Sequence, residues 1–263
     1  MTDRAVKAKL RSLLRAAQKT GGDGTIWLDL FSGSSVIGSK LRSRTRLSGI
    51  SFDVSHGEWF DLGRRVVINT DVGWIRTGFV AALWCACPCS TWSIARRPMI
   101  SSQQELLGMA SALADVNLCR LLEAGNATMK ASVEVAHACL RARIPSIFEN
   151  PHSSLAWKTK AWQALAEMSD VQQVVLDQCR FGTPWRKRTR LQLLHVSNPG
   201  LLDRRCAGAR GQCSATNRPH VQIIGSAMSR RAAAYPQKLA VAGAAVLADS
   251  VERKKLAGFF RHV

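Results

Sequence analysis

Strand-like and helical patterns alternate along most of this chain, and the alternation limits the folds that it can adopt. Runs rich in β-branched and aromatic residues occur at 25–31, 48–54, 66–70, 79–85, 144–149, 172–178 and 190–196. Helical spacings lie between several of them, and Ser102 with Glu105 forms a capping-box signature for a helix that Gly125-Asn126 should end. The alternation predicts an α/β fold with a mostly parallel sheet flanked by helices. Such sheets bind ligands at the carboxyl ends of their strands.

Four regions follow from these patterns. Residues 1–24 form a basic helix or extension that lacks the apolar stretch of a secretion signal, with an organelle transit peptide as the alternative. Residues 25–196 form the main α/β domain. Residues 197–228 are rich in Gly, Pro, Arg and Cys and predict a short basic insert. Residues 229–263 are expected to return as an Ala-rich helix, at 229–250, and a basic tail.

The chain carries a large excess of positive charge. Its 263 residues include 37 Lys and Arg against 18 Asp and Glu, a net charge of +19. The basic residues are spread along the chain, which favours a polyanionic partner, nucleic acid first, over an unspecific basic surface. No apolar run reaches membrane-spanning length, so no membrane association is expected. Eight cysteines without an export signal predict reduced thiols and an intracellular protein.

Acidic residues follow the first three predicted strands. Asp29 ends the first strand before a turn of small residues, Asp53 closes the second strand, and Asp71 follows the third. A small-residue turn lets backbone N–H groups approach a ligand, and an acid after the second strand commonly holds ribose hydroxyls. Together the three fit an adenosine-type cofactor. The alternative is that they are turn and cap residues, for which Asp is favoured.

Residues 82–93, ALWCACPCSTWS, hold three cysteines at alternate positions. Their spacing does not suit zinc, because ligand pairs usually have two to four residues between them. Cys85 and Cys87 fit a buried strand, whereas Cys89 stands beyond it, after Pro88, in a polar turn. A cysteine there, in a basic environment, ionises more readily and can attack an electrophile; an inert thiol is the alternative. Glu149, at the end of a later strand, suits a substrate ring that is protonated as the thiolate adds.

Four segments stand in a characteristic order along the chain: Asp29-Leu30-Phe31-Ser32-Gly33, Cys87-Pro88-Cys89-Ser90-Thr91-Trp92-Ser93, Glu149-Asn150-Pro151 and residues 181–191 (FGTPWRKRTRL). They resemble the ordered motifs of the DNA cytosine-5 methyltransferases, from about residue 26 to 245, and the shortness of the chain resembles forms found in mobile elements and phages. The resemblance implies a Rossmann-like S-adenosylmethionine-dependent methyltransferase fold, with a mostly parallel sheet flanked by helices. The insert at 197–228 takes the place of a target-recognition region.

The resemblance also implies a mechanism. The target cytosine would leave the DNA helix, and Cys89 would attack its carbon 6 while Glu149 holds ring nitrogen 3 and the exocyclic amine. Carbon 5 would then take the methyl group, lose a proton and expel Cys89. Asn150 would either hold the loop around Glu149 or contact the backbone of the base.

Roles for individual residues follow from the same resemblance. The expected catalytic residues are Cys89, Glu149, Asn150, Lys187 and Arg188. The expected cofactor-binding residues are Asp29, Phe31, Ser32, Gly33, Asp53, Asp71 and Pro88. The expected substrate-binding residues are Ser90, Ser93, Arg186, Arg190, Arg204 and Arg205. Either Lys187 with Thr189 or Arg188 with Arg190 fills the basic positions of the fourth segment, and both alternatives stay open.

The chain departs from the family pattern in its first and last motifs. Ser34-Ser35 stands where a second glycine is common, and residues 232–240 (AAAYPQKLA) keep only the proline and the helix after it. These changes favour a catalytically impaired relative that binds DNA or a partner protein, whereas retention of Cys89 and Glu149 favours an enzyme. An RNA cytosine methyltransferase is a further alternative, which the pairing of Glu149 with Asn150 disfavours.

The insert contains a candidate metal set, Cys206, Cys213 and His220, with His195 nearby. Intervals of six residues are not typical of zinc sites, so we expect free side chains and no metal. The resulting prediction is a monomeric DNA (cytosine-5-)-methyltransferase that acts on double-stranded DNA. It would work in the nucleus of a eukaryote, or otherwise in the cytoplasm with the nucleoid.

Overall fold

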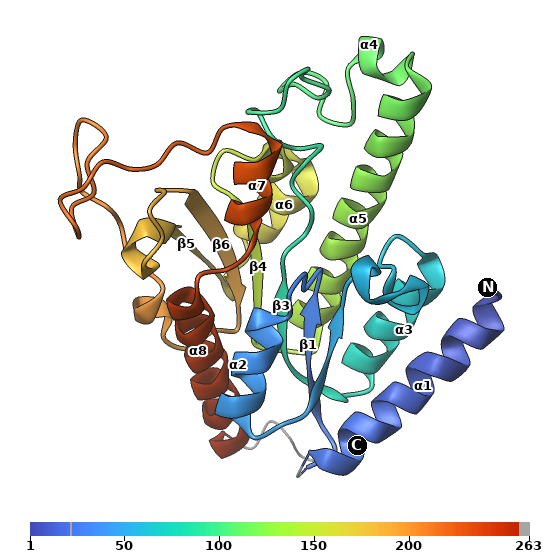
Figure 1. The fold of residues 1–263 in the computed structure, drawn as a ribbon. Coiled ribbons are helices and arrows are strands. Elements are labelled where there is room, and N and C mark those ends of the chain that lie inside the picture. The colour runs from blue at the N-terminus through green and yellow to red at the C-terminus, as the bar shows by residue number, and fades with distance from the viewer. Residues whose placement is uncertain (22, 258–263) are drawn as a thin grey trace.

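Six strands form one sheet, and helices cover both of its faces (Figure 1). The computed structural model describes residues 1–21 and 23–257. The strands are β1 (Ile26–Leu30), β2 (Gly49–Phe52), β3 (Val80–Cys85), β4 (Ser146–Pro151), β5 (Val171–Asp177) and β6 (Arg188–Leu194). They lie in the order β2-β1-β3-β4-β6-β5. Only β6 runs against the others, because it pairs antiparallel with both β4 and β5. The prediction of an α/β fold with a mostly parallel sheet is confirmed.

The helices form two layers (Figure 1). One face of the sheet is covered by α1 (Asp3–Thr20), α3 (Arg65–Arg76), α5 (Val116–Arg141) and α6 (Lys160–Ala166). The other is covered by α2 (Val36–Thr45) and α8 (Gln237–Leu256), which pack against each other. Two short helices, α4 (Ala110–Leu113) and α7 (Gly225–Ala233), lie toward the end of the molecule where β1 finishes. The 3-10 turns are η1 (Val54–His56), η2 (Glu58–Phe60), η3 (Leu155–Lys158), η4 (Gln178–Phe181) and η5 (Pro199–Leu201).

Strand β1 shows how the sequence builds these two layers. All five of its residues are buried. Because side chains alternate along a strand, Ile26, Leu28 and Leu30 join the core on the α1 face, while Trp27 joins the core on the α2 face. The same alternation puts the carboxylate of Asp29 on the α2 face, within reach of the start of that helix.

The strand predicted at 66–70 is wrong, because this segment lies inside helix α3. Its buried positions include Val67, Asp71, Trp74 and Ile75, a spacing of three to four residues that belongs to a helix. The run of β-branched residues imitates a strand locally, but the apolar stripe continues beyond it and packs against α1 and α5. Asp71 therefore does not follow a strand.

The helix predicted from Ser102 to Gly125 is also wrong. The Ser102 hydroxyl does accept from the Glu105 amide, but this pair closes a turn, and Glu105 in turn accepts from the amide of Ala110 at the start of α4. Helix α5 begins only at Val116 and runs through Gly125 without a break. Glycine is needed at 125 for close packing, because a Cβ there would lie 2.1 Å from the hydroxyl of Thr91.

The helix predicted at 229–250 is split. Helix α7 ends at Ala233 and α8 begins at Gln237, with Tyr235 and Pro236 between them. Proline disfavours the helical conformation in the residue before it, which accounts for the break. The first part of the predicted basic tail is helical, since α8 continues to Leu256, and positions 258–263 lie outside the described residues.

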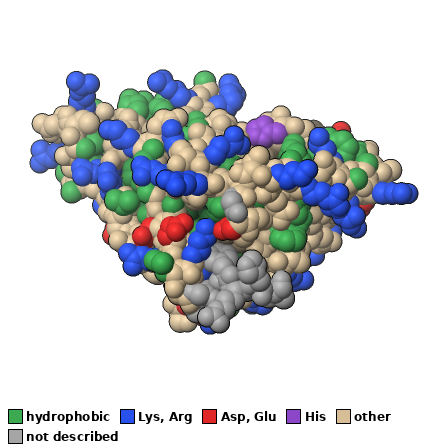
Figure 2. Space-filling model, turned by 90° about the horizontal axis from the view of Figure 1, so that it is seen from below, with side chains coloured by type: hydrophobic (Ala, Val, Ile, Leu, Met, Phe, Trp, Pro, Cys, Tyr) green, Lys and Arg blue, Asp and Glu red, His purple; other side chains and the backbone are tan. Residues whose placement is uncertain are grey.

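Basic side chains are widely distributed over the surface. Figure 2 shows Lys and Arg scattered over the face seen from below, with few acidic groups among them. The positive charge is therefore not confined to one edge of the sheet. Among residues 1–21 and 23–257, no helix is long and apolar enough to cross a membrane.

Candidate active site

The strand order reverses beside β1, and the motif residues meet at that point. From β1 the chain crosses to β2 on one side and later returns to β3 on the other. In doubly wound sheets this switch point opens a crevice at the carboxyl ends of the strands, where ligands bind. The turn after β1 and the Pro-Cys segment after β3 both begin there, and the amide of Ala86 donates to the carbonyl of Leu30 to join them.

The turn after β1 is held by its neighbour β2. Phe31, Gly33 and Ser35 all have positive φ angles, which folds the backbone tightly before α2. The Ser32 amide donates to the Phe52 carbonyl, and the Gly33 amide donates to the Asp53 carboxylate at 2.9 Å. A side chain at Gly33 would meet open space, so the turn faces an unfilled region.

Two of the acids predicted to bind a cofactor hold this turn in place. Asp29 is buried and accepts from the Gly38 amide in the first turn of α2; burial raises the pKa of its carboxyl to about 7. Asp53 accepts from Gly33 and from Ser55. Burial alone would raise the pKa of Asp53, but these hydrogen bonds lower it below its ordinary value. Asp53 is half-buried and ionised at the end of β2, so its carboxylate can accept a further hydroxyl.

The predicted position of Asp71 is wrong, because Asp71 lies in helix α3. Its carboxylate is fully buried inside α3, has no hydrogen-bond partner, and has a pKa raised well above its ordinary value by desolvation. Its predicted role in cofactor binding rested on a strand end, and the segment before Asp71 is helical instead.

Cys89 lies in a loop that β3 and β4 hold together. These strands pair in parallel with Cys85 opposite Phe148, so the Pro-Cys segment and the Glu149-Asn150 segment emerge side by side. The Asn150 side chain donates to the Cys87 carbonyl at 2.8 Å, and the Trp92 amide donates to the Cys89 carbonyl. Asn150 thus ties the Pro-Cys segment to β4, and its predicted catalytic role stays a prediction.

The thiol of Cys89 is not primed for ionisation. Burial raises its pKa, Lys187 lowers it in opposition, and the Glu149 carboxylate raises it again. The expectation that a basic environment makes Cys89 ionise readily is therefore wrong for the unliganded protein. Desolvation by the surrounding loop outweighs the single nearby lysine.

Glu149 is held by a residue that the sequence analysis missed. The hydroxyl of Tyr235 donates to Glu149 Oε2 at 2.8 Å and accepts from the Trp84 indole at 3.2 Å. Glu149 Oε1 is buried without a partner. Burial raises the pKa of Glu149, while Lys187 and the Tyr235 hydrogen bond lower it in part. Tyr235 is the only tyrosine in the chain, and it comes directly before Pro236, the proline that the last motif keeps. This position could have indicated a role for Tyr235 at the site.

The structure distinguishes the two alternatives for the basic segment. Lys187 is close enough to shift the pKa of both Cys89 and Glu149, and its ammonium donates to the Ala232 carbonyl beside α7. Arg188 instead pairs with Asp177, and Arg190 lies over the Trp157 ring. Lys187 therefore provides a cation at the site, whereas Arg188 is held by Asp177 and its catalytic role stays a prediction.

The chain matches no family model and no curated protein. A solved structure of the Entamoeba histolytica methyltransferase EhMeth is similar to it over 90% of this chain and 99% of that chain, at 10% sequence identity and a TM-score of 0.37. A likeness of this degree assigns no activity.

A basic group lies on the other side of the Glu149-Asn150 segment. Arg190, Arg188 and Arg205 are close enough to His152 to lower its pKa, in addition to the larger effect of burial. Arg205 and Arg188 are exposed; Arg205 pairs at 4.0 Å with Asp203, and Arg188 pairs with buried Asp177. We call these three arginines the His152 cluster.

The remaining predicted substrate residues have mixed environments. Arg186 pairs with buried Asp177 and donates to the Cys206 carbonyl, so it has a structural role. Arg204 lies over the Phe181 ring. Ser93 accepts from the Ala95 amide in a turn, while Ser90 and Pro88 are exposed on the loop that carries Cys89.

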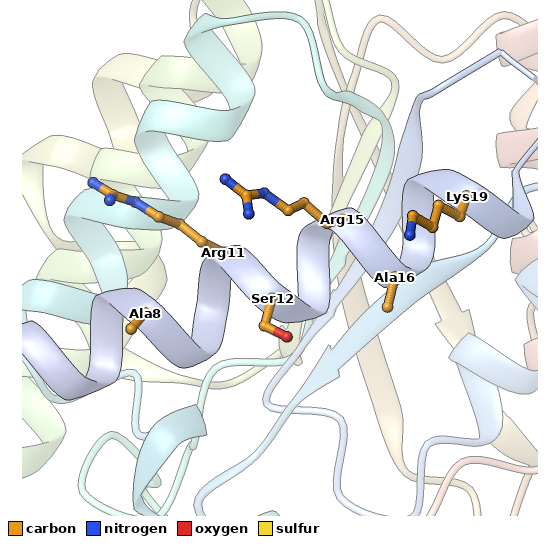
Figure 3. Close-up of a pocket in the computed structure, with 6 residues that line it drawn as sticks. All are labelled: Ala8, Arg11, Ser12, Arg15, Ala16 and Lys19. Atoms are coloured by element: carbon orange, nitrogen blue, oxygen red, sulfur yellow. The ribbon is translucent and has the colours of Figure 1, made fainter.

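A surface hollow occurs away from this site. It lies along α1 and is lined by Ala8, Arg11, Ser12, Arg15, Ala16 and Lys19 (Figure 3). All of these residues belong to one helix, and none is a motif residue. The hollow is therefore separate from the convergence of Cys89, Glu149 and Lys187.

The structure brings together the three candidate metal ligands of the insert. Cys206, Cys213 and His220 form a cluster with Cys179, which the sequence analysis did not include. His195 is not part of it, because its ring nitrogen lies 2.8 Å from the Leu140 carbonyl.

Proposed function

We propose that this protein transfers a methyl group from S-adenosylmethionine to carbon 5 of cytosine in DNA, through a covalent adduct with Cys89. The observation that carries the proposal is the convergence of Cys89, Glu149 and Lys187. They come from three sequence segments; β3 and β4 pair beside Cys85 and Phe148, and Lys187 is close enough to lower the pKa of both Cys89 and Glu149. A thiol, a carboxyl group and a cation are the groups needed to add a nucleophile to a pyrimidine ring and stabilise the charge that develops.

The hydrogen bonds of Glu149 indicate where its proton would reside. Tyr235 donates to Oε2, so that oxygen is an acceptor, and a proton on the carboxyl group belongs on Oε1. The raised pKa of Glu149 favours this protonated form. Oε1–H would donate to ring nitrogen 3 of the cytosine as the Cys89 sulfur bonds to carbon 6. Carbon 5 then takes the methyl group as its bond to the sulfonium of the donor breaks, which leaves a thioether. The proton on carbon 5 passes to water, ring nitrogen 3 returns its proton to Glu149, and the bond from Cys89 to carbon 6 breaks to release the thiolate.

The turn after β1 fits the cofactor in part. Space is open above Gly33, and Asp53 offers a half-buried carboxylate at the end of β2 for ribose hydroxyls. Phe31 would lie against the cofactor, and Asp29 would act by holding the start of α2. When bound, S-adenosylmethionine supplies an electrophilic methyl group. Asp71 plays no part in this proposal.

We expect Tyr235→Phe to lower kcat by about 10- to 100-fold, since hydrogen bonds to charged groups contribute about 1.5–3 kcal/mol. The hydroxyl keeps the Glu149 proton on Oε1 and also lowers the pKa of Glu149. The apparent pKa of Glu149 in the pH profile should therefore rise in the variant, while the affinity for S-adenosylmethionine stays unchanged. An unchanged kcat and an unchanged profile would remove Tyr235 from the mechanism.

We expect Arg205→Ala to weaken DNA binding with little dependence on sequence, and to reduce the slope of log K against log salt concentration by about one. Arg205 is an exposed member of the His152 cluster that pairs only weakly with Asp203, whereas exposed Arg188 pairs with buried Asp177. Arg11→Ala removes the same charge from the α1 hollow and serves as the control. Equal losses from both variants would indicate an unspecific basic surface, which was the alternative drawn from charge alone.

A covalent trap tests the proposed function itself. The protein is incubated with S-adenosylmethionine and mixed-sequence duplex DNA that contains 5-fluorocytosine, whose fluorine cannot leave carbon 5 as a proton does. We expect a denaturant-resistant complex with the wild-type protein and none with Cys89→Ser. A complex only on matching RNA would transfer the proposal to RNA, and no complex on either would favour a DNA-binding module without activity.

A further inference from the structure

Three cysteines and one histidine converge beside the insert. The sulfur atoms of Cys179, Cys206 and Cys213 and a ring nitrogen of His220 all lie within 4.8 Å of one another. The three cysteines are buried and His220 is half-buried. Cys206 Sγ and His220 Nε2 are 3.7 Å apart. Ligand atoms on a tetrahedral zinc ion, at the usual Zn–S and Zn–N lengths, are about 3.5–3.8 Å apart.

The insert folds so that its ligand atoms point inward. Gly208 permits a tight turn between Cys206 and Cys213, because a Cβ there would lie 1.9 Å from the Gln212 carbonyl. The Cys213 amide donates to the Arg218 carbonyl, and the His220 amide donates to the Gly211 carbonyl. These bonds bring His220 back over the turn that carries the two cysteines.

The fourth ligand comes from the main domain. Cys179 lies in η4, directly after β5, 27 residues before Cys206. The Cys206 amide donates to Asp177 at the end of β5, and the Arg186 guanidinium donates to the Cys206 carbonyl. The cluster therefore joins the insert to the end of β5 and to Arg186, the residue before Lys187.

The sulfur of Cys206 has donors of its own. The amide of Ser214 lies 3.3 Å from Cys206 Sγ, and the hydroxyl of Ser214 lies 3.5 Å from it. Donors of this kind stabilise a thiolate that binds a metal.

We propose that Cys179, Cys206, Cys213 and His220 bind one Zn²⁺ ion in a closed, structural site. Three thiolates and one imidazole complete tetrahedral coordination, so no position is open for catalysis. The three cysteines form a small cluster of buried residues that is separate from the main core clusters. Metal binding supplies folding free energy that so small a core does not. The proposal is independent of methyl transfer.

Metal content and cobalt substitution test the site. We expect the full-length protein, purified without chelator, to contain about one zinc per chain by mass spectrometry of metals. Replacement by Co²⁺ should give the visible absorption of a tetrahedral thiolate site. Cys213→Ser should lose most of the bound metal, whereas Cys119→Ser, which changes a half-exposed cysteine of α5 outside the cluster, should keep it.

A second variant covers the case in which Cys213→Ser does not fold. His220→Cys keeps four ligands, so it should retain the metal and shift the cobalt spectrum toward that of four thiolates. The proposal is overturned if wild-type protein neither contains zinc nor gives the cobalt spectrum. It is also overturned if thiol titration of the denatured protein finds two fewer reactive groups than the eight cysteines, because a disulfide would then occupy the cluster.

Discussion

Replacing Cys89 with serine is expected to lower methyl transfer by at least about 10³-fold, because the serine hydroxyl is a far weaker nucleophile than a thiolate. No other cysteine replaces it, since Cys85 and Cys87 are buried in the core. Transfer of a labelled methyl group to DNA measures the loss. Cys119→Ser is the matched control and should keep full activity. Substantial transfer by Cys89→Ser would exclude the covalent mechanism.

The same thiol predicts the pH dependence. Burial raises the pKa of Cys89, so the reactive thiolate becomes more abundant as pH rises from neutral toward that pKa. The rate of adduct formation should therefore increase with pH on this limb. Lys187 lowers the pKa of Cys89, so Lys187→Met should move the limb to higher pH.

Replacing Glu149 with glutamine is expected to lower kcat by about 10²- to 10⁴-fold, the usual contribution of a positioned general acid. The amide cannot give a proton to ring nitrogen 3, although its size lets the hydrogen bond with Tyr235 persist. The affinity for S-adenosylmethionine, measured by calorimetry, should stay unchanged, because Glu149 lies at the end of β4 and not in the turn after β1.

Glu134→Gln is the control for this change. It removes one carboxylate from α5 that pairs with Arg65, outside the candidate site. Full activity in this control together with loss in Glu149→Gln would assign the effect to the active site. Equal turnover of Glu149→Gln and wild type would remove Glu149 from the mechanism.

The sequence predicted those parts of the structure that depend on neighbouring residues alone. Strand β1, the small-residue turn after it and the position of Cys89 beyond β3 follow from short apolar runs and their punctuation. The helix at 65–76 was not predicted. A short β-branched run looks the same in a strand and in a buried helix, and only the spacing of apolar residues over a longer segment distinguishes the two.

Contacts between distant segments account for what the sequence could not provide. Tyr235 meets Glu149 across 86 positions, and no spacing rule relates them. Cys179 joins the cysteines of the insert only because β5 and β6 pair. The different partners of Lys187 and Arg188, which are adjacent in sequence, likewise depend on contacts with distant segments, Ala232 for one and Asp177 for the other.

Because Tyr235 lies in the break between α7 and α8, close to the end of the sequence, the candidate site is completed late in synthesis. A nascent chain that has emerged only as far as α6 already contains Cys89 and Glu149, but it lacks Lys187, Tyr235 and the helix that packs on α2. Ribosomes that stop between α6 and Tyr235 would release fragments in which the Glu149 carboxyl group lacks its hydrogen bond from Tyr235. Under the proposed function, methyl transfer would thus require a polypeptide whose translation has passed Tyr235.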